Sequence, residues 1–150
     1  MVTFQLRRMK TEDISELLEF YMLANPHSNS ESIEKWTLDT IRENPDLCYV
    51  AEVQGRVIGG VSALMRDKEI GIIDDLAVAP KYQRKGIGSE LLKKAMEELK
   101  HKGAEIITLK IHYLCSDSIP FYYKHGFRIS GMVQDCFGQK QDAITMNKYL

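Results

Sequence analysis

The segment from Asp75 to Gly88, DLAVAPKYQRKGIG, constrains the fold of this chain more than any other stretch. An apolar strand runs into a proline and a basic turn, and two glycines follow at the start of a long amphipathic helix. The first turn of a helix has backbone N–H groups without partners and the positive end of the macrodipole, so it attracts anions. This order predicts a strand–turn–helix unit that binds a diphosphate.

The side chains of this turn favour the same ligand. Gly86 and Gly88 have no Cβ, so a phosphate can approach the main chain closely. Lys81, Arg84 and Lys85 add positive charge, and a guanidinium can hold phosphate oxygens with two hydrogen bonds. The phosphate loop GxxxxGK[ST] is absent, and of the dinucleotide pattern GxGxxG only the first two glycines are present. These two nucleotide-binding loops are therefore excluded.

Two short motifs, in order along the chain, carry the strongest indication of a family. Residues 83–88, QRKGIG, fit the pattern (Q/R)xxGxG/A after a strand that ends LxVxP, and residues 118–127 are SIPFYYKHGF. The first resembles the pyrophosphate-binding motif of the GNAT superfamily of acyl-CoA-dependent N-acetyltransferases, and the second is similar to its later AxxFYxKxGF helix. An ordinary strand–turn–helix crossover is the alternative for the first motif alone. Together the motifs extend the resemblance over nearly the whole chain.

Composition permits this interpretation and narrows the partners. A chain of 150 residues is expected to form a single N-acetyltransferase domain over residues 1–150. The net charge of −1 does not favour a broad nucleic-acid-binding surface, and no stretch approaches membrane-spanning length. Cys48, Cys115 and Cys136 fit neither a metal site nor a disulfide framework. We therefore expect a cytoplasmic protein with reduced thiols and no metal, nucleic-acid or membrane partner.

Hydrophobic periodicity predicts an alternating order of strands and helices. Because a helix crosses between the strands at 69–79 and 105–111, these two should be parallel. We expect an α/β fold, a mixed twisted sheet of about seven strands with helices on both faces and a central parallel pair around the acyl-CoA cleft, as the resemblance also implies. Thr11 and Asp117 are the expected N-caps of the first and last helices. Strands are predicted at 2–8, 47–53, 57–65, 69–79, 105–111, 127–134 and 142–149, and helices at 11–24, 31–43, 88–102 and around Tyr122.

The resemblance implies where acetyl-CoA would bind. Pantetheine is a chain of amides, so it can add to the edge of the strand at 75–78 as a peptide would. The backbone N–H of Leu76 is expected to donate to the thioester oxygen and to stabilise its developing charge. The diphosphate is expected over the basic turn. The residues expected to contact the cofactor are Leu76, Ala77, Val78, Gln83, Arg84, Lys85, Gly86, Ile87, Gly88, Ser89 and Ser118.

Tyr122 aligns with the family tyrosine that protonates the departing thiolate. A phenol and a CoA-type thiol differ by only about 1–2 pKa units, so proton transfer between them is nearly matched. Packing in an aromatic cluster with Phe121 and Phe127 is the structural alternative. Tyr123 lies on a different helix face and is the less favoured catalytic alternative.

Asp74 and Asp75 are adjacent on a strand, so we expect them to point to opposite faces. In some small-amine members of the family a Glu-Asp pair stands here, where one acid assists amine deprotonation through water and the other attracts the cationic substrate. Other members place a glutamate where this chain has Ile72, so the general base stays open. Solvated strand acids without a function are the alternative.

Other departures from the family concern the cleft and the histidines. Cys115 stands where the family often has asparagine, and Ser118 where it has alanine. Covalent catalysis by Cys115 is not favoured, because no Cys/His/acid arrangement is evident around it. All four histidines are expected on the surface or in loops, although the loop around His27 lies where the family builds its acceptor pocket. Trp36 and Tyr21 are expected either to line that pocket or to pack in the core.

The predicted function is N-acetyl transfer from acetyl-CoA to a primary amine by direct attack in a ternary complex. The acceptor stays open between a small-molecule amine and a protein amine, and the family often forms homodimers through its late strands. A non-catalytic acyl-CoA-binding sensor is the alternative. The presence of Tyr122 argues against the sensor, and Cys115 in place of asparagine argues for it.

Overall fold

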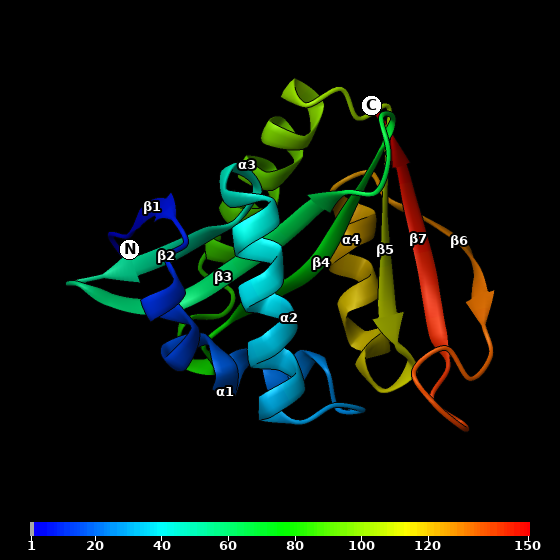
Figure 1. The fold of residues 1–150 in the computed structure, drawn as a ribbon, viewed down its shortest axis with the longest axis horizontal. Coiled ribbons are helices and arrows are strands. Elements are labelled where there is room, and N and C mark those ends of the chain that lie inside the picture. Colours follow the sequence, from blue (N-terminus) through cyan, green and yellow to red (C-terminus); the bar gives the residue numbers. More distant parts are fainter. Residues whose placement is uncertain (1) are drawn as a thin grey trace.

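The computed structural model describes residues 2–150 as one seven-stranded sheet with helices on both faces (Figure 1). The strand order is β1-β2-β3-β4-β5-β7-β6. Only the pair β4–β5 is parallel among the described strands, and the other neighbours are antiparallel. This topology confirms the predicted fold class and the central parallel pair. The strands are β1 Gln5–Arg8, β2 Tyr49–Val53, β3 Arg56–Met65, β4 Ile70–Val78, β5 Ile106–His112, β6 Arg128–Val133 and β7 Ala143–Tyr149.

The helices divide between the two faces of the sheet and enclose two separate cores. One core packs residues of α1 and α2 against the sheet, and the larger core packs α3 and α4 against the other face. Across residues 2–150, none of the helices is both long and apolar enough to span a bilayer. The helices are α1 Ile14–Ala24, α2 Ser30–Glu43, α3 Ile87–His101 and α4 Ile119–Lys124, with short 3-10 turns at Thr11–Asp13, Pro45–Leu47, Pro80–Tyr82 and Tyr113–Ser118.

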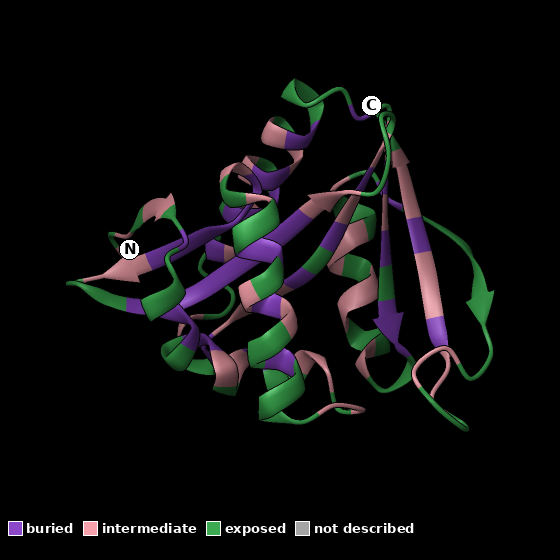
Figure 2. Cartoon of the chain, viewed as in Figure 1, coloured by how far each residue is buried: buried purple, intermediate pink, exposed green. Residues whose placement is uncertain are grey.

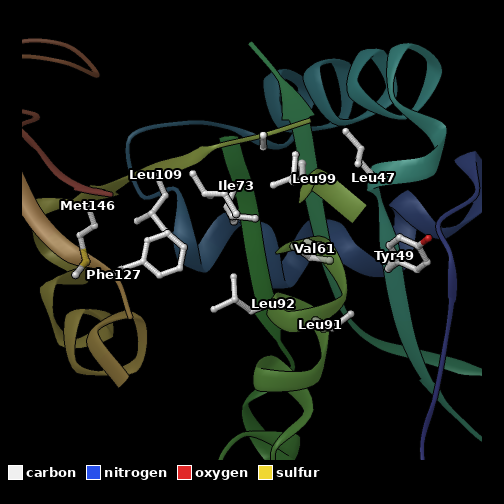
Figure 3. Close-up of a cluster of buried hydrophobic side chains, with 14 of the residues drawn as sticks. Leu47, Tyr49, Val61, Ile73, Leu91, Leu92, Leu99, Leu109, Phe127 and Met146 are labelled. Atoms are coloured by element: carbon white, nitrogen blue, oxygen red, sulfur yellow. The ribbon is translucent and has the colours of Figure 1, made fainter. Parts of the chain in front are cut away.

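Helix α3 anchors the larger core through one apolar stripe. Figure 3 shows Leu91, Leu92 and Leu99 of α3 in the cluster with Val61 and Ile73 of the sheet. Each of these three leucines is fully buried, which stabilises the fold by roughly 1.5–3 kcal/mol per side chain. The amphipathic helix predicted after the basic turn is therefore confirmed, and its buried face consists of Ile87, Leu91, Leu92, Ala95 and Leu99.

Two predicted helix caps are wrong. The chain enters α1 through a 3-10 turn, and the carboxylate of Asp13, not the hydroxyl of Thr11, accepts the backbone N–H of Lys10 at 2.7 Å. Helix α4 begins at Ile119 without a side-chain cap, because the 3-10 turn Tyr113–Ser118 already fills the segment where Asp117 was expected to cap. In both places the local turn satisfies the backbone before the helix starts.

A β-bulge at Asp74 resets the alternation of side chains along β4. Ser62 pairs with Asp75 and Ala63 pairs with Ile73, so Asp74 is the extra residue. Asp75 bonds to side chains from the α1 and α2 side, and Asp74 lines a cavity on that same side. The expectation that Asp74 and Asp75 point to opposite faces is therefore wrong, because the bulge breaks the period of two.

Candidate active site

Strands β4 and β5 part in the middle of the sheet and leave one edge of β4 free. Their pairing ends at Ile73 and Leu109, while β4 stays paired with β3 as far as Val78. Ala79 donates its N–H to Ile58 of β3, so the alternation of the backbone turns the polar groups of Leu76 and Val78 towards the open edge. An amide chain can therefore add to β4 at the two positions expected to hold pantetheine. The backbone of Ala77 faces β3 instead.

The basic turn after β4 presents its backbone to solvent ahead of α3. Arg84 and Gly86 both have positive φ, at 62° and 83°, a geometry in which successive N–H groups form an anion-binding concavity. A Cβ at Gly86 would meet nothing within 4 Å, so the turn is open where a phosphate is expected. Lys85 is exposed beside it, whereas the side chain of Ile87 is buried and leaves only its backbone for a ligand.

Three side chains expected at the cofactor make contacts within the protein. Gln83 donates from Nε2 to the carbonyl oxygen of Val78 at 3.0 Å, on the free edge of β4. The hydroxyl of Ser89 lies 3.0 Å from Nε2 of His125, and the hydroxyl of Ser118 donates to the carbonyl of Cys115 at 2.8 Å. Their contact with acetyl-CoA stays a prediction, and Gln83 would have to leave Val78 for an amide to bind that carbonyl.

Tyr122 lies on the inner face of α4, next to the opening between the strands. Its ring packs edge-on against Phe121 and Phe127, with centroids 5.1 and 5.8 Å away, so the aromatic cluster is present. Burial raises the pKa of the Tyr122 phenol, and the charges of Asp75 and Cys115 raise it further. The phenol therefore keeps its proton at neutral pH and is a proton donor. Tyr123 is 69% exposed, as its place on a different helix face predicts.

The carboxylate of Asp75 is buried and fully occupied by two donors. Asn25 donates from Nδ2 to Oδ1 at 2.6 Å, and Trp36 donates from Nε1 to Oδ2 at 2.9 Å. Burial raises the pKa of Asp75, and the nearby charge of Asp74 raises it further. Because both oxygens are taken, Asp75 holds α1 and α2 against β4.

Asp74 is the acid that remains open to a ligand. Its side chain is exposed to solvent through the cavity, although protein surrounds it on the other sides. This partial loss of hydration raises the pKa of Asp74 above the usual range of a carboxyl group. A carboxylate of this kind can exchange protons with an amine near neutral pH.

A cavity of about 600 Å³ opens on the α1/α2 side of the sheet, beside the point where β4 and β5 part. One wall comes from α2 and the loop before it, and the floor comes from polar side chains of β5 and β7. The size suits a small ligand or part of a larger one. Its lining residues include Asn25, His27, Trp36, Arg66, Ile72, Asp74, Thr108, Lys110, Ser130, Phe137, Thr145 and Asn147.

His27 and Phe137 line one end of this cavity, and the buried His112 lies beside them. The ring of His27 stacks on Phe137 at 4.1 Å and lies parallel to His112 at 5.3 Å. His112 is 2% exposed at the end of β5, so its expected place on the surface or in a loop is wrong. Its Nδ1 accepts the backbone N–H of Leu114 and its Nε2 contacts the side chain of Gln141. The stack joins the loop before α2 to the β6–β7 loop.

Cys115 joins the 3-10 turn before α4 to the end of α1. Its thiol lies 3.7 Å from the carbonyl oxygen of Leu23 and 3.8 Å from that of Ala24. Burial raises the pKa of Cys115, and the charge of Asp117 adds to the effect. The thiol is therefore protonated at neutral pH, which does not suit a nucleophile.

Comparisons with known proteins agree with this geometry. Residues 11–127 match the family described as the acetyltransferase (GNAT) family. An uncharacterized N-acetyltransferase of Methanocaldococcus jannaschii is 25% identical over 144 residues, which cover 88% of this chain and 64% of that protein. This chain thus spans slightly less than two-thirds of that relative.

Two further similarities cover the chain almost completely. An N-alpha-acetyltransferase of Sulfurisphaera tokodaii is 26% identical over 155 residues, which cover 95% of this chain and 91% of that protein. The crystal structure of Ard1 from Thermoplasma volcanium superposes with a TM-score of 0.90 at 23% identity and covers 99% of both chains. The latter similarity establishes the fold.

Proposed function

The chain belongs to the acetyltransferase (GNAT) family, and on this basis we propose that it transfers an acetyl group from acetyl-CoA directly to a primary amine. One observation carries the proposal. Where β4 and β5 part, Tyr122 from one face of the sheet comes within electrostatic reach of Asp75, and Asp74 beside it lines the cavity on the other face. A thioester bound at this opening would meet a proton donor from one side and an amine from the other.

The free edge of β4 and the basic turn support the cofactor part of the proposal. Pantetheine amides would bond to the backbone of Leu76 and Val78, as an added strand does. The diphosphate would lie on the backbone N–H groups between Arg84 and Gly88, at the start of α3. The N–H of Leu76 would then donate to the thioester oxygen.

The proposed reaction follows from these positions. An ammonium group loses its proton, through water, to Asp74, and the free amine attacks the thioester carbon. The new C–N bond forms while negative charge develops on the carbonyl oxygen, which the Leu76 N–H stabilises. The C–S bond then breaks, and the thiolate takes the phenolic proton of Tyr122. The nitrogen of the new amide releases its extra proton through water, which returns a proton to the phenolate, and Asp74 gives its own proton to solvent.

The similarity to known proteins narrows the class of acceptor amine only in part. The relative from Sulfurisphaera tokodaii is named an N-alpha-acetyltransferase, which favours a peptide amine, but a small amine would also fit the cavity. The three cysteines are free thiols, and we propose the cytoplasm as a reducing compartment that keeps them so. A homodimer stays a proposal taken from the family resemblance.

An acceptor panel that measures CoA release tests the proposal against the sensor alternative. Peptides with free α-amines, polyamines, amino acids and aminoglycosides are incubated with acetyl-CoA and the protein. Turnover of one acceptor class, with saturation by both substrates in a sequential pattern, would support direct transfer. A protein that CoA stabilises thermally but that acetylates no amine in the panel would instead be a sensor.

A further inference from the structure

The floor of the cavity is a polar surface that no helix covers. Thr108 and Lys110 of β5 pair in register with Asn147 and Thr145 of β7, and all four side chains line the cavity. Figures 1 and 2 show α2 in front of β3 and β4, with β5 and β7 uncovered on the same side. The floor therefore meets whatever enters beside Asp74.

Both acidic and basic side chains line this cavity, at different positions. Among its lining residues Asp74 is the acid, and Arg66 and Lys110 are the bases. Pairing of Ile73 with Leu109 places Asp74 and Lys110 at the next position on each strand, across the opening. Within residues 2–150 neither of these two side chains makes an ion pair, so both charges are available to a ligand.

Arg66 adds positive charge farther along the same surface. Its backbone N–H bonds to Ile70, four residues from Asp74 on β4, which corresponds to about 13 Å of strand. Its contact with Asp67 is long, at 3.5 Å, and exposed, and such a pair contributes little. A purely cationic acceptor, such as a polyamine, would place its second charge against these two bases.

We infer that the acceptor is a primary amine that also carries an anionic group, a carboxylate or a phosphate. This inference rests on the proposed function. The ammonium lies at Asp74, and the anion lies on the polar floor, where Lys110 and then Arg66 attract it. A peptide α-amine followed by an acidic residue has this chemistry, and so does a small aminoalkyl carboxylate or phosphate.

Matched acceptors test the inference. One arm compares two peptides that are identical except at the second position, which is Glu in one and Gln in the other. The small-molecule arm compares 4-aminobutyrate with butylamine and phosphoethanolamine with ethanolamine. In at least one arm we expect KM for the anionic member of a pair to be lower than KM for its neutral partner by about fivefold or more. This difference should shrink as salt is added. The arm in which the preference appears identifies the source of the anion.

Two variants connect the preference to Lys110. Lys110→Gln should shrink the KM difference between the anionic acceptor and its neutral partner, and Arg66 accounts for the part that remains. Lys110→Glu should reverse the preference, so that a peptide with Lys at the second position becomes the better substrate. Lys100→Gln, on the exposed side of α3, is the matched control and should change neither KM.

The outcomes separate this inference from the proposed function. Equal KM values within every pair, or a preference that Lys110→Gln does not reduce, would overturn the inference while turnover itself supports the function. Failure of both arms and of the wider panel to release CoA would overturn the function and the inference with it.

Discussion

The indole Nε1 of Trp36 donates a 2.9 Å hydrogen bond to Oδ2 of Asp75, which joins α2 to the strand that bears the free edge. Asn25, at the end of α1, occupies the other carboxylate oxygen. Asp75 is 4% exposed, so no room remains for an acceptor to bind it. Asp75 thus positions the cavity wall, and Asp74 is the acid that would meet an acceptor in the proposed reaction.

Asp75→Asn should make stability less dependent on pH. Burial raises the pKa of Asp75 above its ordinary value of 3.8 in the folded protein. The stability that this group contributes is therefore fully present below that ordinary value and is lost as pH rises through the higher folded pKa. Chemical denaturation between pH 4.5 and 8 should show the free energy of unfolding of wild type falling relative to the variant by at least ~1.4 kcal/mol, the value of one pKa unit.

Asp39→Asn, an exposed change on α2, serves as the control for this titration and should track wild type at every pH. A difference between wild type and Asp75→Asn that stays constant over the range would show that Asp75 has no raised pKa.

The fold could be predicted from the sequence because most elements carry a strong period. The amphipathic helix α3 was predicted correctly, since its apolar spacing directly encodes one buried face. The bulge at Asp74 was missed. The apolar positions Ile73 and Leu76, three residues apart, both face the larger core, and this odd spacing could have revealed it.

The site could be predicted only where a local motif exists. The basic turn and Tyr122 lie in contiguous motifs, whereas the cavity joins segments far apart in the chain. Thr108 and Lys110 alternate with buried residues in β5, which marks a polar face but not what lies opposite it. The stack of His27, His112 and Phe137 depends on two loops that meet the end of β5, for which the sequence has no periodic pattern.

Asp74→Asn should reduce kcat most between the raised pKa of Asp74, about 6, and the pKa of the amine. Because its pKa is raised, Asp74 becomes protonated at a higher pH than an ordinary carboxyl group. On acidification the kcat of wild type should therefore start to fall at a higher pH. The variant cannot accept the amine proton, and we expect at least a roughly tenfold loss at pH 7 that shrinks as the pH nears the pKa of the amine. Steady-state rates at pH 6–9 measure this loss. An unchanged pH profile would show that Asp74 is a solvated strand acid without a catalytic role.

Gly86→Glu should weaken CoA binding by tenfold or more, about 1.4 kcal/mol. The change adds a carboxylate where the diphosphate is expected and forces a side chain into a backbone with φ of 83°. Gly55→Glu is a matched control, because Gly55 has φ of 79°, is equally open, and lies in the hairpin between β2 and β3. Calorimetry should show normal affinity for Gly55→Glu, and equal losses in both variants would attribute the effect to backbone strain.

Tyr122→Phe should separate catalysis from packing. The ring keeps its edge contacts with Phe121 and Phe127, so the fold and the affinity for acetyl-CoA should persist. The departing thiolate loses the proton that the raised pKa of the phenol keeps available at neutral pH. General acid catalysis contributes about 10²–10⁴-fold, so kcat should fall by that range in a coupled assay with an accepted amine.

The neighbouring hydroxyl provides the control for Tyr122. Tyr123 is 69% exposed on another face of α4, so Tyr123→Phe removes an identical group that points away from the opening and should cost little activity. The loss in Tyr122→Phe should also persist with the thioester of a poorer leaving thiol and diminish with a better one, because a thiolate of lower pKa needs the proton less. Near-full turnover of Tyr122→Phe with every thioester would make Tyr122 a packing residue and place the proton donor elsewhere.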